Sequence, residues 1–454
     1  MSVNLIVSGK LVTDTSIYEN TAIAIKDGKI AAIGNKDNMP SAEEEIDFGD
    51  LMILPGVVDA HTHSLGDPDE GHYNSTKGAA AGGVTTINDH PLDIGYAPTS
   101  KDDILKKAEK ASKEAVVDFS LFAEGVPSRI DDILDVANSG ITGYKILMHA
   151  TSGAASYGLG AVNDGELYAM FELIGKAGQT AIVHAENDWI VNYLVEKFIK
   201  EEKTYLAAHN ETRPEVTETV AVLTAIEIAR TLNCRLHIAH ASVPRTFEIV
   251  DEARREGVLV TAETCPHFLI CNEDRWKDIG AQFKINPPLR SEKSRLLLWE
   301  FLRKDKIHLI ASDHAPHPIN HKPNVFDNFS GTPSIETLFQ IMYSEGVAKG
   351  EIGINRLVKL LTINPAKLLG LYPEKGAIEI GSDADLIIFD PSKKWVLEGS
   401  KLHMQSGWSM YEGFNVTGKV FATYVRGKKV YEDGEVIGEK GYGKWIKKQN
   451  NYYI

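Results

Sequence analysis

The sequence predicts an α/β protein that combines a (β/α)₈ TIM barrel with a small β-sandwich domain built from both chain ends. In the middle of the chain, short apolar runs alternate with helix-like segments. At both ends, apolar and polar residues alternate between Gly and Asp turns. The length of 454 residues suits a barrel of about 250 or more residues with a smaller second domain.

Residues 1–54 are predicted to form the N-terminal part of the β-sandwich domain. Residues 4–13 and 21–34 have strand patterns, and Asp27-Gly28 divides the second run as a hairpin turn does. The same pattern returns in residues 384–390 and 418–436. Residues 371–454 are therefore expected to supply the C-terminal part of this domain and a tail.

The predicted barrel spans residues 55–370. Helical patterns follow most of its strands, as in residues 102–116, 164–178, 215–232 and 291–304. Repeated strand–helix units of this number favour a TIM barrel, whose active site lies at the C-terminal ends of the strands. The predicted strands are residues 56–60, 84–88, 118–123, 143–148, 180–184, 235–240, 258–263 and 308–313.

The composition favours a small-molecule enzyme over a nucleic-acid-binding protein. With 48 basic and 63 acidic residues the formal charge is −15, which disfavours binding to a phosphate backbone. Three cysteines without a CxxC pair predict a reduced, cytoplasmic setting. We expect no membrane partner, because no run of 18 apolar residues and no leader pattern is present.

Metal-binding residue types gather at the ends of the predicted barrel strands. His61 and His63 in "DAHTHSLGD" lie two residues apart, so in an extended segment both rings point to one side. Each donor alone has an ordinary alternative as a hydrogen-bonded side chain near a loop, but their repetition favours a catalytic site for a divalent ion such as zinc. Four further donor-type residues occur at strand ends, namely Lys145, His184, His240 and Asp313.

Lys145 differs from the others because an ammonium group cannot bind a cation. Burial inside the barrel would lower its pKa and leave a neutral amine. A neutral amine can take up carbon dioxide and become a carbamate with two oxygens able to bridge two metals. The alternative is a lysine whose stem lies along the barrel wall.

Further motifs are distributed over almost the whole chain. They are "LPGVVDAHTH", "AAAGGVTTIND", "GYKILM", "AIVHAEN", "RLHIAHAS", "ETCPHFL", "KINPPLR", "ASDHAPH", "NPAKLLGL" and "KGAIEIGSDADLIIFDP". In these motifs and their order the sequence resembles the amidohydrolase superfamily, specifically its cyclic-amidase branch of allantoinases, hydantoinases, dihydropyrimidinases and dihydroorotases.

The resemblance implies a dinuclear metal site with a defined set of ligands. His61, His63 and Asp313 would hold one ion, His184 and His240 the second, and carbamylated Lys145 would bridge both. The implied cofactors are two divalent metal ions, with zinc expected, and carbon dioxide as the lysine carbamate. Asp313 would be the catalytic residue that moves a proton from the attacking water to the leaving nitrogen. Relatives are commonly dimers or tetramers, so a homo-oligomer is implied.

Three positions bear on which cyclic amide is the substrate. Dihydroorotases carry an arginine and an asparagine where this chain has Leu65 and Leu92, so a substrate carboxylate would lack its partners. Hydantoinases and dihydropyrimidinases usually have an oxyanion-stabilising tyrosine where this chain has Ala150, and His149 is a candidate substitute.

Allantoinases fit these positions best, because "GGVTTINDHPLD" resembles their strand-two loop. We therefore predict hydrolysis of allantoin to allantoate, a step of purine catabolism, with a hydantoinase, dihydropyrimidinase or cyclic imide hydrolase as the alternative. The sequence differs from the usual allantoinase pattern in two places, the segment "SLGDPDEGHYN" and the pair His90 and Asp93. A non-catalytic scaffold of the same fold is disfavoured because all six ligand positions are filled, and an enzyme for exocyclic or peptide-like amides is a third reading.

Asn286 and Ser330 match positions where relatives contact the substrate ring. The roles of His90, His149, His267 and His317 stay open between substrate contact and ordinary polar contact. His237 is expected to lie on the opposite strand face from His240 and to pack beneath the helices.

Overall fold

The computed structural model describes residues 2–64, 70–91, 97–150, 159–319, 321–452 and 454. Leu65, Leu92 and Asp93, which entered the substrate prediction, lie outside these described residues. Within the described ranges no helix is both long enough and apolar enough to cross a membrane.

A parallel sheet of eight strands forms the centre of the molecule, and its strands pair in sequence order from β5 to β12. The two edges of this sheet meet, because Thr62 bridges His314 in parallel and the His63 N–H donates to the His314 carbonyl over 2.7 Å. The predicted (β/α)₈ barrel is thereby confirmed. Its strands are β5 Val57–Thr62, β6 Val84–Asp89, β7 Asp118–Glu124, β8 Gly143–Leu147, β9 Thr180–His184, β10 Arg235–Ile238, β11 Val260–Thr264 and β12 Leu309–Ile310.

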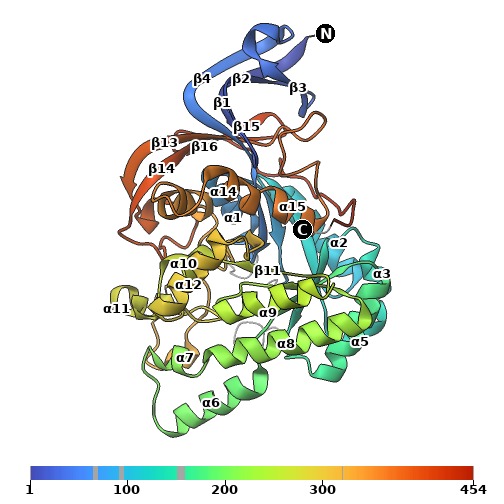
Figure 1. Cartoon of the computed structure of the whole chain (residues 1–454), viewed down its shortest axis with the longest axis vertical. Coiled ribbons are helices and arrows are strands. Elements are labelled where there is room, and N and C mark those ends of the chain that lie inside the picture. Colours follow the sequence, from blue (N-terminus) through green and yellow to red (C-terminus); the bar gives the residue numbers. More distant parts are fainter. Residues whose placement is uncertain (1, 65–69, 92–96, 151–158, 320, 453) are drawn as a thin grey trace.

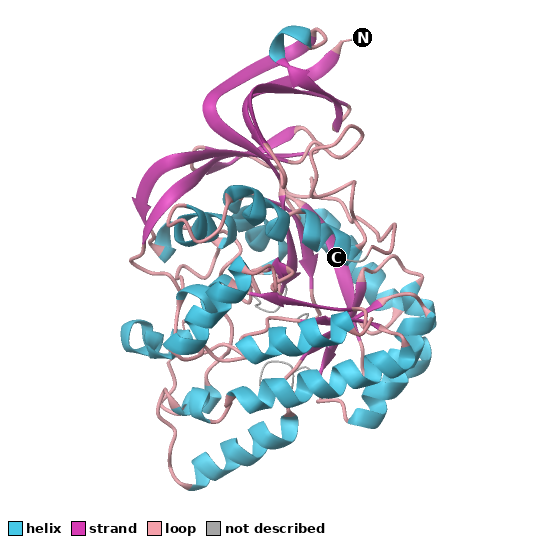
Figure 2. Cartoon of the chain, in the orientation of Figure 1, coloured by secondary structure: helices cyan, strands magenta, loops and turns pink. Residues whose placement is uncertain are grey.

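Helices surround this sheet on its outer side (Figures 1 and 2). Two of them begin with capping boxes, in which Ser100 and Asp103, or Asn163 and Glu166, exchange side-chain and backbone hydrogen bonds. The helices are α1 Gly71–Gly82, α2 Lys101–Glu114, α3 Ile133–Ala137, α5 Asp164–Lys176, α6 Asp188–Lys200, α7 Ala208–Glu211, α8 Glu215–Leu232, α9 Pro244–Arg255, α10 Pro266–Ile270, α11 Trp276–Ile279, α12 Glu292–Arg303, α13 Leu338–Met342, α14 Ile354–Leu361 and α15 Ile363–Leu369.

Both chain ends together form a second, mixed sheet, as predicted. The predicted turn at Asp27-Gly28 is present with φ values of 52° and 80°, the left-handed region that a tight hairpin needs. The two halves of the chain meet where β13 pairs antiparallel to β4, with Leu386 opposite Pro55. The sheet order is β16-β15-β14-β13-β4-β1-β2-β3, with strands β1 Val3–Val12, β2 Ile17–Lys26, β3 Lys29–Asn35, β4 Ala42–Pro55, β13 Leu386–Val396, β14 Asn415–Val425, β15 Lys428–Glu432 and β16 Glu435–Val436. The domain boundaries at residues 54/55 and 370/371 stay predictions.

A buried charge cluster fastens the second sheet to the barrel. The Lys375 ammonium lies 2.5 Å from Asp118 at the start of β7, 2.8 Å from Asp383 and 2.9 Å from Asp385. Arg426, just after β14, makes a second ion pair with Asp118. Because Lys375 and its three carboxylate partners are buried, each of these charges depends on the others for compensation.

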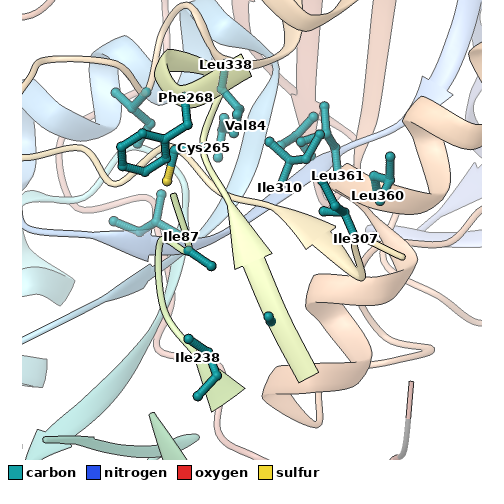
Figure 3. Packing of buried hydrophobic residues seen from close by; sticks show 14 of the residues in the cluster. Val84, Ile87, Ile238, Cys265, Phe268, Ile307, Ile310, Leu338, Leu360 and Leu361 are labelled. Carbon is teal, nitrogen blue, oxygen red and sulfur yellow. The ribbon is translucent and has the colours of Figure 1, made fainter. Parts of the chain in front are cut away.

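The apolar core of the barrel has one part outside the strands and one part inside them, and a separate cluster that includes Leu5 and Ile23 lies within the second sheet domain. Figure 3 shows the outer part, where Val84, Ile87 and Ile238 belong to the same cluster of buried side chains as Leu338 and Leu361. The inner part contains residues of several strands and also the C-terminal tail, with Val58, Phe122, Ile182, Leu309 and Ile446 in one cluster. The tail is held there by a 2.7 Å hydrogen bond from the Ile446 N–H to the Phe119 carbonyl.

Candidate active site

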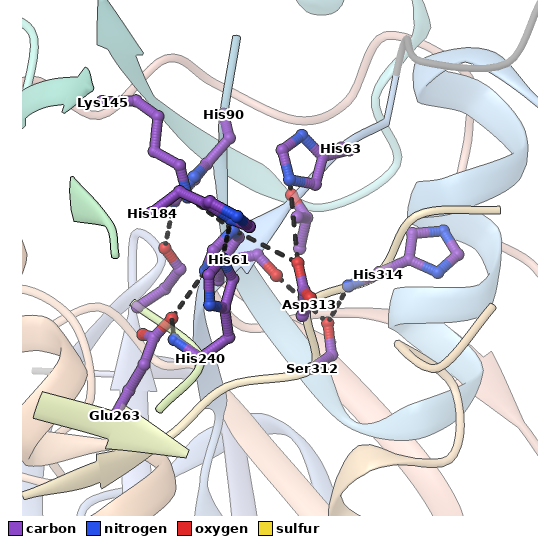
Figure 4. A network of polar contacts seen from close by, with 12 residues as sticks. His61, His63, His90, Lys145, His184, His240, Glu263, Ser312, Asp313 and His314 are labelled. Atoms are coloured by element: carbon purple, nitrogen blue, oxygen red, sulfur yellow. Dashed lines mark hydrogen bonds and ion pairs between the residues drawn. The ribbon is translucent and has the colours of Figure 1, made fainter. Parts of the chain in front are cut away.

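All six predicted metal ligands lie at the carboxyl ends of barrel strands, where their side chains converge (Figure 4). His61 is the last residue but one of β5, and Lys145 lies in β8. His184 is the last residue of β9, whereas His240 and Asp313 follow β10 and β12.

The donor atoms of these side chains are close enough to share ions. The Nε2 atom of His61 is 3.3 Å from Asp313 Oδ1 and 3.2 Å from Lys145 Nζ. His63 Nε2 is 3.7 Å from the same Asp313 oxygen. On the other side, His184 Nδ1 and His240 Nε2 are 2.9 Å apart. The ring centroids of His61 and His240 are 5.2 Å apart, so the group around His61 lies directly beside the pair of His184 and His240.

Three of the histidines are held in the tautomer that a metal requires. His61 Nδ1 donates to Glu263 Oε1 over 2.5 Å, and His63 Nδ1 donates to the Pro91 carbonyl over 3.1 Å. His184 uses its Nε2 to donate to Glu186 Oε2 over 2.9 Å. Because a neutral imidazole carries one proton, the opposite nitrogen of each ring presents a lone pair to the centre of the site. The chemistry of this donor set therefore fits divalent metal ions.

Two predicted ligands have strained backbones. His240 and Asp313 have φ values of 36° and 48°, which non-glycine residues adopt at a cost of about 1–3 kcal/mol. The His240 N–H donates to Glu263 Oε1 over 3.1 Å, which holds the turn in place. Its Nδ1 has no hydrogen-bond partner among the described residues, although the ring is buried. Strain of this kind is typical of functional sites.

Burial sets the charge state of the site. It lowers the pKa of Lys145 and that of His184, and it lowers the pKa of His63 to about 3. It raises the pKa of Asp313 to about 7. The site therefore presents neutral imidazoles and favours a neutral lysine amine, the form that can react with carbon dioxide.

Several residues that hold the predicted ligands in place were missed in the sequence. Glu263 in β11 contacts His61, His240 and His237, and Glu186 holds His184. Asp59 accepts the N–H groups of His61 at 3.3 Å and of Ser312 at 3.0 Å, which ties β5 to the segment after β12. Glu263 and Glu186 could have been found from their positions in "ETCPHFL" and "AIVHAEN", because each is a carboxylate at or just after the end of a predicted barrel strand.

The prediction for His237 was wrong. Its Nε2 lies 3.2 Å from Glu263 Oε2 and its Nδ1 2.7 Å from Thr261 Oγ1, so it supports the site instead of packing beneath the helices. The alternation argument failed because β10 ends at Ile238, and His240 adopts positive φ outside the strand.

His90 and His149 both belong to the surroundings of the ligands. The ring of His90 stacks on His61 with centroids 3.7 Å apart and donates from Nε2 to the Ala60 carbonyl at 3.1 Å. His149 uses both ring nitrogens, with Nδ1 2.7 Å from Asp188 and Nε2 3.2 Å from Arg213. It therefore lacks a spare N–H to replace the tyrosine that is absent at Ala150.

The segments of the two predicted substrate-binding residues lie side by side. The Gly331 N–H, next to Ser330, donates to the Lys284 carbonyl over 3.0 Å, two residues before Asn286. Asn286 Oδ1 and Ser330 Oγ are buried atoms without a hydrogen-bond partner in the described part of the chain. His317 holds this rim, since its Nε2 lies 3.0 Å from the Ser330 carbonyl.

Comparison with known proteins identifies the family of the chain. The model of the amidohydrolase family matches residues 52–430. The chain belongs to the amidohydrolase family. It is 34% identical to an L-hydantoinase of Paenarthrobacter aurescens over 450 residues, which cover 97% of each chain. It is 32% identical to an allantoinase of Escherichia coli over 454 residues, which cover 97% of this chain and 98% of the relative.

Solved structures of the family have the same fold. A dihydropyrimidinase from Brevibacillus agri superposes with a TM-score of 0.90 at 30% identity and covers 98% of both chains. The amidohydrolase family is metal-dependent, and the relatives named here are hydrolases of cyclic amides. This chain has a cluster of histidines and a cluster with Asp313 whose donor atoms are close enough to hold a metal ion. The predicted family, fold and enzyme class are confirmed.

Proposed function

We propose that this protein hydrolyses the C–N bond of a cyclic amide in a ureide ring and uses two divalent metal ions. The observation that carries the proposal is the convergence of six donors from five strand ends, with three imidazoles oriented by a carboxylate or a carbonyl. His61, His63 and Asp313 would hold one ion and His184 and His240 the other. Lys145, as a carbamate, would bridge them, with zinc as the expected metal.

The metals would activate a water molecule and polarise the scissile carbonyl. Asp313 is the proposed proton carrier, because its Oδ1 lies 3.3 Å from His61 Nε2 and 3.7 Å from His63 Nε2, at the centre of the first ligand group. Its side chain is 13% exposed, so it is not completely closed off from solvent. From there it can accept the proton of the attacking water and return it to the leaving nitrogen.

Allantoin is the first candidate substrate and hydantoin-type rings are the second. Asn286 and Ser330 would contact the ring, because their buried oxygens lack protein partners among the described residues and cyclic ureides offer N–H donors. The second candidate is favoured by the L-hydantoinase relative, whose identity of 34% is similar to the 32% of the allantoinase.

The test is turnover of allantoin, hydantoin, dihydrouracil and dihydroorotate by metal-replete protein. We expect ring opening of allantoin, and none of dihydroorotate. Asp313→Asn should abolish ring opening, whereas its neighbour variant His314→Gln should retain it, because the His314 ring lies beside α1, 3.3 Å from Ser75. No turnover on the whole panel by protein that holds its metals would overturn the proposal.

We further propose a cytoplasmic homo-oligomer, a dimer or tetramer. In α6, all of whose residues are described, Val191 alone is buried. Trp189 and Tyr193 on this helix are 82% and 65% exposed, which is unusual for large aromatic side chains and suits a contact between copies. Light scattering should give a multiple of 49.9 kDa for the wild type and a smaller mass for Trp189→Glu. A wild-type monomer would contradict this.

A further inference from the structure

A cysteine directly follows strand β11, beside the proposed metal pair. Cys265 follows Thr264 directly and keeps an extended backbone, with φ −121° and ψ 154°. Its side chain is buried next to Phe268 (Figure 3). This thiol is not among the six ligands of the proposed function.

Three donors of different chemistry meet at this point. The Cys265 sulfur, a ring nitrogen of His267 and a carboxylate oxygen of Asp313 all lie within 4.8 Å of one another. They come from the end of β11, the first turn of α10 and the segment after β12. Thiolate, imidazole and carboxylate together are a donor set typical of zinc and cadmium.

His267 supplies the independent sign that a ligand belongs here. Its ring is fully buried, yet neither Nδ1 nor Nε2 has a hydrogen-bond partner within the described residues. Buried imidazole nitrogens almost always have a hydrogen-bond or metal partner, so two nitrogens without one on the same ring indicate a missing ligand. An ion held with Cys265 and Asp313 would supply it.

We infer that Cys265, His267 and Asp313 form a third metal site, which takes a zinc-like or cadmium-like divalent ion when that ion is in excess. As the sulfur–metal bond forms, the thiol proton leaves to solvent, so the thiolate balances one charge of the ion. The site has three protein donors and leaves a fourth position for water.

Occupation of this site inhibits the enzyme, because it shares Asp313 with the proposed catalytic centre. This inhibition rests on the proposed function, in which Asp313 carries the proton. We therefore expect excess zinc to lower the turnover. Binding itself does not depend on that function, since it requires only the three side chains.

The experiment titrates cadmium into zinc-loaded protein and follows the ultraviolet charge-transfer band of a cadmium–thiolate bond. The six ligands of the catalytic pair include no thiol, so exchange of cadmium into that pair gives no such band. We expect the band to saturate at one cadmium per chain. Cys265→Ser should remove it, and His267→Gln should shift the titration to higher cadmium. Cys271→Ser is the matched control, since Cys271 is also buried, and should keep the band.

A band that survives in Cys265→Ser, or no band in the wild type, overturns the site. Inhibition by excess zinc should disappear in Cys265→Ser, and inhibition that persists there while the band is lost overturns the regulatory role alone. If the protein turns over none of the four test substrates, the proposed function fails, while the cadmium band still decides the site.

Discussion

Replacement of Glu263 by glutamine tests whether the ligands are held by a carboxylate behind them. Glu263 Oε1 lies 2.5 Å from His61 Nδ1 and 3.1 Å from the His240 N–H, and Oε2 lies 3.2 Å from His237 Nε2. Gln keeps the size of the side chain but removes its charge and one of its two acceptor oxygens. His61, the His240 N–H and His237 then compete for one neutral acceptor oxygen, so the hydrogen bond that fixes the His61 proton on Nδ1 is weakened or lost.

The expected effect follows from these contacts. A hydrogen bond to a charged group contributes about 1.5–3 kcal/mol, and the bond between Glu263 and His61 is of this kind. Loss of a partner behind a metal ligand typically costs 10- to 100-fold in metal affinity, which is about 1.4–2.8 kcal/mol. The two figures agree, so we expect Glu263→Gln to weaken the ion held by His61 by that factor.

The assay is competition between the protein and a chelator, with metal content measured after equilibration. Glu336→Gln is the matched control, because Glu336 is also a buried glutamate bonded to a histidine, His403, but lies outside the site. A Glu263→Gln protein that folds normally and binds both metals as tightly as the control would show that the Glu263 carboxylate does not support metal binding.

Three further predictions follow from the structure. Lys145→Ala should lose activity, because the bridging carbamate cannot form, and short carboxylic acids should restore part of it; full activity without them would remove the bridging role. Lys375→Met should destabilise the fold by about 3–5 kcal/mol in urea denaturation, because Asp118 and two further buried carboxylates lose their shared cation, and a change under 1 kcal/mol would contradict this. The hydrogen bond to Glu336 raises the pKa of His403, so its contribution is complete below about pH 6.5 and is lost as the pH rises through the raised value. The Tm difference between wild type and His403→Gln should therefore shrink above that pH, and a constant difference would exclude the linkage.

The barrel strands were predictable because buried parallel strands are short apolar runs that recur between helices. The predicted strand 180–184 coincides with β9, and the predicted helix 215–232 coincides with α8. The errors lie at strand ends. Predicted strands 235–240 and 308–313 are longer than β10 and β12, which end at Ile238 and Ile310, and His240 and Asp313 lie beyond these ends with positive φ. Apolar periodicity carries no information about such strained backbone positions.

The predicted donors could be found in sequence because each follows an apolar run at the same end of the barrel. The groups behind them could not, because their contacts depend on register between strands. Glu263 reaches His61 across 202 residues of sequence, and Asp59 reaches Ser312 across 253. The sequence likewise gives no indication that both ring nitrogens of His149 have partners, one in Asp188 and one in Arg213.

Anomalous diffraction at the metal edge from zinc-replete crystals would show directly whether the six side chains hold two metal ions. We expect two peaks per chain, one among His61, His63 and Asp313 and one between His184 and His240. We also expect density for a carbamate on Lys145 between the two peaks. A single peak, or two peaks away from these side chains, would show that the six side chains do not form a dinuclear site.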